Sequence, residues 1–226
     1  MSDAARDAAA RAALERIEPG TTIGLGSGRA VWRTMELAHE RWPEGPPLRA
    51  AFASERTAQL GRDLGIEPVE LGADTRLAVA IDGADEIDGD LGLVKGGGAA
   101  LLREKLVVCA AERFVVVAEE RKRVERLGQG FRLPVEIVRF AAEQTRARVL
   151  ALVPEAELRR DEHGDPMVTD EGHHLLDCRL PADGDVGELA AAIKATVGVV
   201  EHGLFLGMAD EVLLGRPDGS VAALTR

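Results

Sequence analysis

The chain of 226 residues is poor in aromatic side chains, with five Phe, two Trp and no Tyr. Proteins that bind single-stranded nucleic acid stack the bases on aromatic rings, so such a surface has little to be built from here. The formal net charge of −11 also disfavours binding to a phosphate backbone, which requires a basic face. We therefore expect no nucleic-acid partner, and no tyrosine is present to act as a catalytic acid.

Cysteines and long apolar runs are scarce as well. Cys109 and Cys178 are the only cysteines, which excludes a framework of several disulfides. No apolar run approaches the roughly 18 residues that a membrane-spanning helix needs, and the charged stretch 1–18 does not resemble a signal peptide. The balance of 46% apolar and 30% charged residues is ordinary for a globular protein. We expect a cytoplasmic protein with no membrane partner.

The first part of the chain alternates short apolar stretches with helical ones. We expect strands at 21–25, 48–53, 77–81, 91–94 and 114–118, and helices at 3–17, 30–42, 55–64 and 99–111. This alternation is typical of α/β proteins, and it predicts a mainly parallel sheet that helices cover on both faces.

The order of elements changes after about Gly130. We expect strands at 135–138, 155–160, 175–180 and 199–204, and helices at 141–152 and 185–195. The order β-α-β-β-α-β is that of a ferredoxin-like α+β module. The sequence therefore predicts a small ferredoxin-like domain over 131–204. A larger domain would comprise 1–130 and 205–226, with two further strands at 211–214 and 220–224.

A glycine-rich segment, Gly24-Leu25-Gly26-Ser27-Gly28, lies between the first expected strand and the helix after it. Glycines let the backbone turn tightly, and the free N–H groups at the start of a helix attract an anion. We interpret Gly26, Ser27 and Gly28 as a candidate phosphate-binding loop. A tight turn without a ligand is the alternative, because the full G-x-G-x-x-G spacing is absent.

An acidic segment follows the expected strand at 77–81 and contains Asp82, Asp85, Glu86 and Asp88. Ligand sites in open α/β sheets lie at the carboxyl ends of strands. Carboxylates at such a place can accept hydrogen bonds from sugar hydroxyls or move protons. The alternatives are a solvated acidic turn and a divalent metal site, although the spacing does not match that of a calcium loop.

A third segment begins with Lys95 at the end of a strand, continues through Gly96, Gly97 and Gly98, and enters a helix that carries Glu104. Three consecutive glycines are costly in entropy, which favours a close approach of the backbone to a ligand. Lys95 can stabilise a developing oxyanion, and a partly buried Glu104 can act as a base. The alternative is an exposed helix face behind a flexible loop.

Other candidate residues give weaker evidence of a functional role. Lys122 follows the strand at 114–118 and can reach a phosphate, although a surface lysine is the commoner case. His173 and His174 are adjacent, so on a strand they would point to opposite faces and not share a metal. We expect Cys109 in the core and Cys178 to be structural.

Two of these segments together resemble a known family. Ile81-Asp-Gly-Ala-Asp-Glu-Ile-Asp88 and Lys95-Gly-Gly-Gly-Ala-Ala-Leu-Leu-Arg-Glu-Lys105 are similar to the signature segments of ribose-5-phosphate isomerase, type A. The later stretches Leu133–Val138, Thr169–Gly172 and Gly198–Phe205 also fit that family's pattern, as does the strand that contains Asp177. The resemblance covers nearly the whole chain.

The resemblance implies interconversion of D-ribose 5-phosphate and D-ribulose 5-phosphate, a step of the non-oxidative pentose phosphate pathway, without a metal or organic cofactor. It implies a Rossmann-like large domain, a ferredoxin-like small domain, and a homodimer or homotetramer. Glu104 matches the general base that moves a proton between C1 and C2, and Lys95 matches the cation beside the enediolate. Asp82 and Asp85 match acids that contact sugar hydroxyls and assist ring opening, and Lys122 matches a phosphate-side lysine.

The phosphate loop departs from the family pattern. Where the family usually reads G-x-G-T-G-S-T, this chain reads Gly24-Leu-Gly-Ser-Gly-Arg-Ala30. Arg29 can supply a charge-assisted phosphate contact or point to solvent. The family also often has a lysine near the start of the first helix, where this chain has Arg6 and Asp7.

Two other functions compete with the isomerase. A repressor domain that senses a sugar phosphate would need a DNA-binding domain before the first strand, and the stretch before Thr21 has room for one helix only. A nucleotide-dependent oxidoreductase has only the glycine loop in its favour. The isomerase is the function that the sequence favours.

Overall fold

The computed structural model describes residues 3–226. Packing divides the chain into two compact units. The first comprises the chain up to Ala84, Arg103–Arg123 and Gly207–Arg226, and the second comprises Asp85–Leu102 and Val124–Leu206. The second unit thus contains 85–102, 124–130 and 205–206 in addition to the stretch expected for the small domain. Compact units need not coincide with domains, so the boundaries at 130 and 205 stay a prediction.

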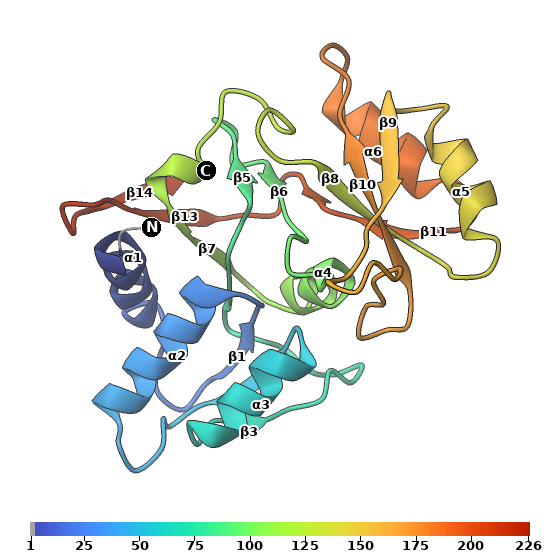
Figure 1. Ribbon diagram of the computed structural model, residues 1–226. Coiled ribbons are helices and arrows are strands. Elements are labelled where there is room, and N and C mark those ends of the chain that lie inside the picture. Colours follow the sequence, from blue (N-terminus) through green and yellow to red (C-terminus); the bar gives the residue numbers. More distant parts are fainter. Residues whose placement is uncertain (1–2) are drawn as a thin grey trace. The chain divides into compact units, whose positions relative to one another are not determined.

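The first unit holds a seven-stranded sheet in the order β14-β13-β7-β4-β1-β2-β3. Figure 1 labels β14, β13, β7, β1 and β3 of this sheet. Its strands are β1 (Thr22–Leu25), β2 (Arg49–Phe52), β3 (Glu67–Pro68), β4 (Ala80–Asp82), β7 (Phe114–Glu119), β13 (Glu211–Gly215) and β14 (Val221–Thr225). All neighbouring strands are parallel except β13 and β14, which are antiparallel. The predicted mainly parallel sheet is therefore confirmed.

Helices pack on both faces of this sheet. They are α1 (Asp3–Leu14), α2 (Arg29–Arg41), α3 (Glu55–Asp63), α4 (Leu101–Cys109) and the short 3-10 helix η1 (Glu120–Lys122). Ile23 and Leu25 of β1 share one core with buried residues of α1 and α2. Gly24 faces the opposite side, where a Cβ atom would lie 2.4 Å from Cγ1 of Val107 in α4. Gly24 is thus required by the packing of α4 on β1.

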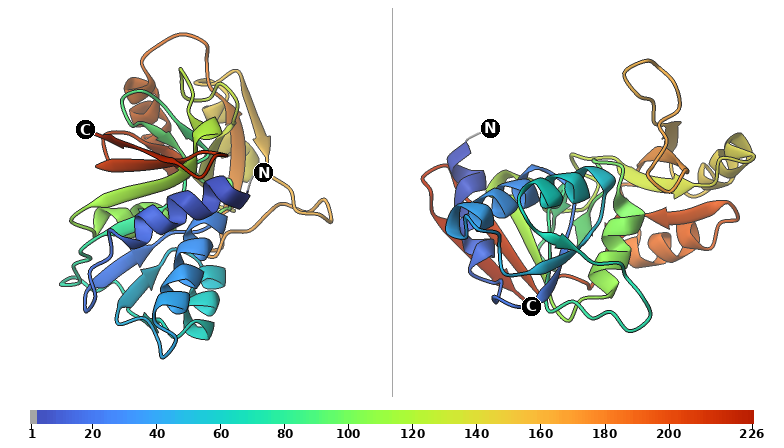
Figure 2. Two further views of the ribbon diagram at one scale, coloured as in Figure 1. Left: turned by 90° about the vertical axis from the view of Figure 1, so that its left-hand side faces the viewer. Right: turned by 90° about the horizontal axis from the view of Figure 1, so that it is seen from below.

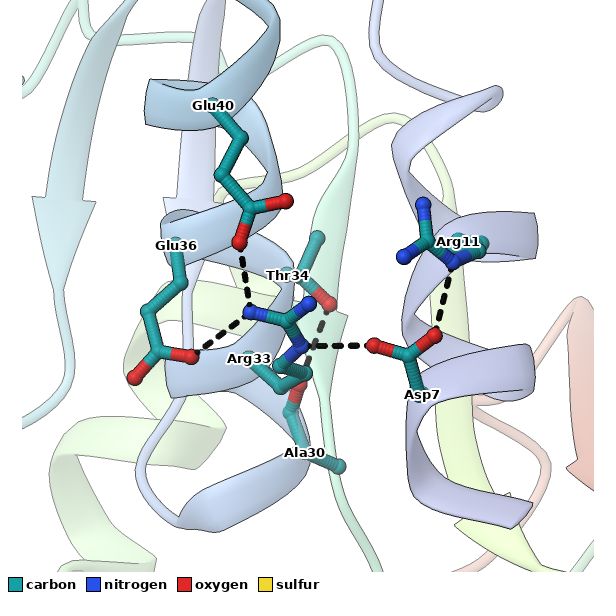
Figure 3. Close-up of polar contacts among 7 residues, drawn as sticks. All are labelled: Asp7, Arg11, Ala30, Arg33, Thr34, Glu36 and Glu40. Atoms are coloured by element: carbon teal, nitrogen blue, oxygen red, sulfur yellow. Dashed lines mark hydrogen bonds and ion pairs between the residues drawn. The ribbon is translucent and has the colours of Figure 1, made fainter. Parts of the chain in front are cut away.

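An ion-pair network joins α1 to α2 within the first unit (Figure 3). Nε of Arg33 lies 2.7 Å from Oδ1 of Asp7, whose other carboxylate oxygen accepts a hydrogen bond from Arg11. Nη1 of Arg33 also contacts Glu36 and Glu40 at 3.0 and 2.9 Å. The arginine that pairs with α1 therefore lies one turn into α2, the helix that follows the glycine-rich segment.

The second unit contains a four-stranded antiparallel sheet in the order β11-β8-β10-β9. Its elements in chain order are β8 (Leu133–Ile137), α5 (Ala142–Val149), β9 (Glu155–Leu158), β10 (His174–Arg179), α6 (Val186–Lys194) and β11 (Val199–His202). Residues of both helices and of the strands line one hydrophobic core, so α5 and α6 cover the same face. The predicted ferredoxin-like module is confirmed. The connection from β9 to β10 extends away from the sheet (Figure 2).

A separate three-stranded sheet in this unit has the order β12-β6-β5. Its strands are β5 (Glu86–Ile87), β6 (Leu93–Val94) and β12 (Leu204–Phe205). The single strand expected at 199–204 is therefore wrong: β11 pairs with β8, whereas β12 pairs with β6. The change of partner occurs at Gly203, where a Cβ atom would lie 2.0 Å from the carbonyl oxygen of Lys95.

Two further expectations from composition can be compared with the structure. Cys109 is exposed at the end of α4, so the expectation that it lies in the core is wrong. The inward face of α4 contains Leu101, Glu104 and Val108 instead. Among residues 3–226, no helix is long and apolar enough to cross a membrane.

Candidate active site

The carboxyl ends of β1 and β4 lie side by side at a point where the strand order reverses. From β1 the chain proceeds to β2 and β3 on one side, and then returns to β4 on the other side of β1. In open α/β sheets, ligands bind at the carboxyl ends of the strands at such a switch point. Gly26 follows β1 and Asp82 ends β4, so both predicted site residues lie there.

Gly26 and Asp82 fit closely against each other. A Cβ atom on Gly26 would lie 1.8 Å from Cγ of Asp82, so only glycine fits beside this carboxylate. The backbone is tied to β4 by a hydrogen bond from Gly26 N to the Ile81 carbonyl at 2.9 Å. Asp82 is 1% exposed, and its Oδ1 accepts a hydrogen bond from Gly83 N at 2.7 Å. The absence of a side chain at Gly26 therefore leaves room for the buried carboxylate of Asp82 at the end of β4.

Glu104 is another buried carboxylate of the first unit. It lies in the first turn of α4 and is 3% exposed, which contradicts the alternative of an exposed helix face. The Ser27 hydroxyl donates to Oε1 of Glu104 at 2.5 Å. The structure thus brings together the turn after β1, the end of β4 and the start of α4 around two carboxylates. A buried carboxylate with a hydroxyl donor is suited to proton transfer.

The residues expected to bind phosphate lie at strand ends of the same unit. Gly28, with φ of +104°, precedes Arg29, which is exposed at the first position of α2. Lys122 is half-buried in η1, directly after β7. Burial alone would raise the pKa of Glu119, but the hydrogen bond from Arg121 and the charges of Arg121, Arg6 and Lys122 hold this pKa below its usual value. Arg6 and Lys122 therefore act on one carboxylate at the end of β7.

In the second unit, Lys95 follows β6 and is 2% exposed. Its backbone N–H donates to the Gly203 carbonyl at 2.8 Å, and its ammonium lies 5.4 Å from the centre of the Phe205 ring. A cation over an aromatic face is stabilised by the ring quadrupole. Contacts of both its backbone and its side chain therefore fix the position of Lys95. A cation that stabilises an anion must be fixed in this way.

The glycine segment after Lys95 is shaped by Asp85. Oδ2 of Asp85 accepts a hydrogen bond from Gly97 N at 2.8 Å. A Cβ atom on Gly97 would lie 2.9 Å from Oδ1 of the same carboxylate. Gly96 has φ of +105° and Ala99 has φ of +62°, a conformation that a residue with a side chain rarely adopts. Gly98 is exposed, and the segment leads into α4.

The other two acids of the acidic segment have structural partners. Glu86 is 2% exposed and accepts hydrogen bonds from the backbone of Gly128, Gly130 and Phe131 at 2.5, 2.5 and 2.7 Å. Oδ1 of Asp88 accepts from its own turn, with Gly92 N at 2.7 Å. The segment is therefore not a solvated acidic turn, since each carboxylate has its own backbone donor.

The histidines and the buried cysteine have no arrangement that suggests a metal. Nδ1 of His173 lies 3.0 Å from Glu136, and Nδ1 of His174 lies 2.9 Å from the Met167 carbonyl, so the two rings have different partners. Within residues 3–226 no group of three His, Cys, Asp or Glu side chains is placed to hold a metal ion. Burial, together with the charge of Asp177, raises the pKa of Cys178 to about 12, so its thiol stays protonated near neutral pH.

Sequence reasoning missed several contacts around these residues. It did not link Ser27 to Glu104, and it gave no role to Phe205 or to Arg159, which contacts the glycine segment. These contacts join residues 77, 110 and 63 positions apart respectively. No local spacing predicts such pairs, although Asp177, the partner of Arg159, lies in a strand that fits the family pattern.

Comparison with known proteins shows the family of the chain. A model of the family described as ribose 5-phosphate isomerase A (phosphoriboisomerase A) matches residues 50–219. The chain is 46% identical over 220 residues to ribose-5-phosphate isomerase A of Synechococcus sp. (strain JA-3-3Ab), covering 96% of each chain.

Solved structures agree with these matches. Ribose 5-phosphate isomerase A of Methanocaldococcus jannaschii is 31% identical with a TM-score of 0.92, covering 100% of both chains. A D-ribose-5-phosphate isomerase solved in complex with phospho-erythronic acid gives the same identity, TM-score and coverage. The protein therefore belongs to the ribose 5-phosphate isomerase A family.

Proposed function

We propose that the protein interconverts D-ribose 5-phosphate and D-ribulose 5-phosphate through an enediolate, with Glu104 as the base. The observation that carries this proposal is the buried Glu104 carboxylate, hydrogen-bonded to Ser27 beside the turn that follows β1. The family to which the chain belongs supports the choice of substrate. The reaction would place the protein in the non-oxidative pentose phosphate pathway.

The reaction requires one proton to move between neighbouring carbons. A base removes the proton from C2 of the open-chain aldose, and the electrons form the enediolate, with the negative charge on the C1 oxygen. The same proton then returns to C1, while the proton of the C2 hydroxyl passes to the C1 oxygen and C2 becomes the carbonyl of the ketose. One carboxylate can perform both transfers under two conditions: it must lie next to both carbons, and water must be kept away from it. Glu104, at 3% exposure, satisfies the second condition.

We assign the charge stabilisation and substrate positioning to three further side chains. The Lys95 ammonium would stabilise the oxyanion of the enediolate, because a buried cation acts strongly in a site of low polarity. Asp82 and Asp85 would hold sugar hydroxyls and assist opening of the ring. These assignments follow the resemblance of 81–88 and 95–105 to the family's signature segments.

We assign the phosphate to the backbone of Gly26, Ser27 and Gly28, to Arg29 and to Lys122. The start of α2 provides N–H groups, and no side chain caps them at Gly28. Gly96, Gly97 and Gly98 are proposed to approach the sugar through their backbone. A structural relative binds phospho-erythronic acid, which carries a phosphate and a carboxylate on a short polyol. This ligand supports a sugar phosphate as the substrate.

We propose further that the reaction uses no metal or organic cofactor, since the chain itself supplies a base and a cation. A homodimer or homotetramer is proposed from the family resemblance. We also propose a cytoplasmic location, from the relation of the chain to a family of metabolic enzymes.

The direct test is turnover by the purified protein in buffer that contains EDTA. We expect ribulose 5-phosphate to form from ribose 5-phosphate, and the reverse reaction to reach the same equilibrium ratio. Absence of turnover in either direction, with the protein folded, would contradict the proposed function. Turnover that appears only after a divalent metal is added would contradict the cofactor-free mechanism.

A further inference from the structure

The Gly96–Gly97 peptide group is held at both of its ends. Its N–H donates to Oδ2 of Asp85 at 2.8 Å, and its carbonyl oxygen accepts from Nη1 of Arg159 at 2.9 Å. The N–H and C=O of one peptide group point in opposite directions. A rotation of this peptide group would therefore break both hydrogen bonds at once.

Arg159 is itself fixed before it reaches this peptide group. Its Nε lies 2.9 Å from Oδ2 and its Nη2 lies 2.5 Å from Oδ1 of Asp177, a bidentate ion pair. Its backbone N–H donates to the Leu175 carbonyl, and its carbonyl accepts from Met167 N. The Arg159 side chain is only 12% exposed. A guanidinium held in this way loses little freedom when it donates a further hydrogen bond.

The segment between Gly96 and Ala99 needs such support. Gly96 and Ala99 both have positive φ, and for Ala99 this conformation is strained. Strained backbone persists only where its surroundings hold it in place. A cation on the carbonyl oxygen also polarises the peptide group, which makes the N–H a stronger donor to Asp85.

We propose that Arg159, oriented by Asp177, is a positioning residue that fixes the Gly96–Gly97 peptide and through it the carboxylate of Asp85. The inference rests on the proposed function, in which Asp85 and the glycine segment contact the sugar. Arg159 acts through the peptide group on a residue that contacts the substrate, and Asp177 acts through Arg159.

Variants of Arg159 and Asp177 test this series of contacts. We expect Arg159→Met to lower kcat by about 100-fold, the scale of a small misplacement of reacting groups, with a smaller change in KM. Asp177→Asn keeps the shape of the side chain and should give a smaller loss. The double variant should be no worse than Arg159→Met alone, because Asp177 acts only through Arg159. Arg159→Lys keeps the charge without the fork and should recover part of kcat.

Arg160 provides the matched control. It is the next residue, is exposed, and donates to the Gly164 carbonyl. Arg160→Met should leave kcat and KM unchanged.

Hydrogen exchange separates positioning from loss of folding and needs no activity. In Arg159→Met and Asp177→Asn, the Gly97 amide should exchange about tenfold faster, while amides of β8 and β10 keep their protection. Unchanged exchange at Gly97, unchanged kcat, or additive losses in the double variant would overturn the proposal. If Arg159→Met does not fold, the kcat of Asp177→Asn and the exchange of its Gly97 amide test the proposal by the same criteria. If the unaltered protein lacks isomerase activity, the proposed function fails, and exchange at Gly97 still tests the contacts.

Discussion

Arg29 occupies a position where the family's phosphate loop usually has a serine. It begins α2, directly after Gly28, and its side chain is exposed. A guanidinium at this place can bind a phosphate dianion with charge-assisted hydrogen bonds, which a hydroxyl makes more weakly. The phosphate is remote from the reacting carbons, so its contacts contribute equally to the bound substrate and the transition state.

We predict that Arg29→Ala raises KM about 10- to 100-fold and leaves kcat nearly unchanged, the cost of one hydrogen bond to a charged group. Steady-state kinetics with ribose 5-phosphate measure both constants. Arg49→Ala is the control, because Arg49 is also exposed but begins β2, at the opposite end of the parallel strands. An unchanged KM in Arg29→Ala would place this side chain outside the phosphate site.

The burial of Glu104 was accessible from the sequence, whereas its partner was not. Leu101, Glu104 and Val108 follow the helical period, and all three are buried. Cys109 lies off this face, which explains why the expectation of a core position failed. Ser27 is 77 positions away from Glu104, so only the assembled sheet reveals the contact.

The α1–α2 pair shows how an element that precedes the sheet supports the site. α2 begins at the proposed phosphate loop, and Arg33 on its next turn binds Asp7 of α1 (Figure 3). The hydrogen bond from Arg33, with the further one from Arg11, outweighs burial and holds the pKa of Asp7 below its usual value of 3.8. The Asp7 carboxylate therefore stabilises the folded state when it is ionised.

We predict that Asp7→Asn lowers the free energy of unfolding at pH 7 by about 0.5 kcal/mol, because Asp7 is 32% exposed and solvent screens the pair. Since the folded-state pKa is the lower one, the stabilisation is complete above the unfolded pKa and is lost as pH falls through the folded pKa. The difference between the two proteins should shrink as the pH falls below 3.8 and vanish below the folded-state pKa of Asp7. Urea unfolding at fixed protein concentration measures it.

Glu36→Gln is the control for this prediction, because Glu36 contacts the same guanidinium but is 47% exposed. Its effect at pH 7 should be smaller. A difference for Asp7→Asn that grows as the solution becomes more acidic would contradict the assigned role.

Elements with a strong local pattern were predictable, and short ones were not. The strand at 114–118 and the helix at 30–42 were expected within one residue of β7 and α2. The strands β5 and β12 were missed because two residues are too few to show a strand pattern. β12 also pairs with a distant strand, since Leu204 lies opposite Val94. At β5, Glu86 is buried inside an acidic segment only because the backbone at 128–131 surrounds its carboxylate with donors.

At the scale of the whole molecule, the chain leaves one unit and returns to it twice. It crosses between units at Ala84, Leu102, Arg123 and Leu206. The first crossings fall within the two signature segments, and the last lies beside Phe205, next to Lys95. The sequence pattern predicts each module. It does not reveal where the chain passes from one unit to the other, because neither the hydrophobic periodicity nor the residue composition changes at these points.

The oligomeric state is a prediction at the same scale. We expect sedimentation equilibrium to give two or four times the chain mass of 24.1 kDa at micromolar concentration. This expectation follows from the family resemblance, which implies a homodimer or homotetramer. A species of 24.1 kDa across the whole concentration range would contradict it.

The central claim is that Glu104 moves the proton, and replacing its carboxylate by an amide tests it most directly. We predict that Glu104→Gln lowers kcat by about 10²- to 10⁴-fold, the usual contribution of a general base, with little change in KM. Glu112→Gln, at an exposed glutamate just after α4, should retain full activity. Near-normal kcat in Glu104→Gln would contradict the claim, and another group would then have to be the base.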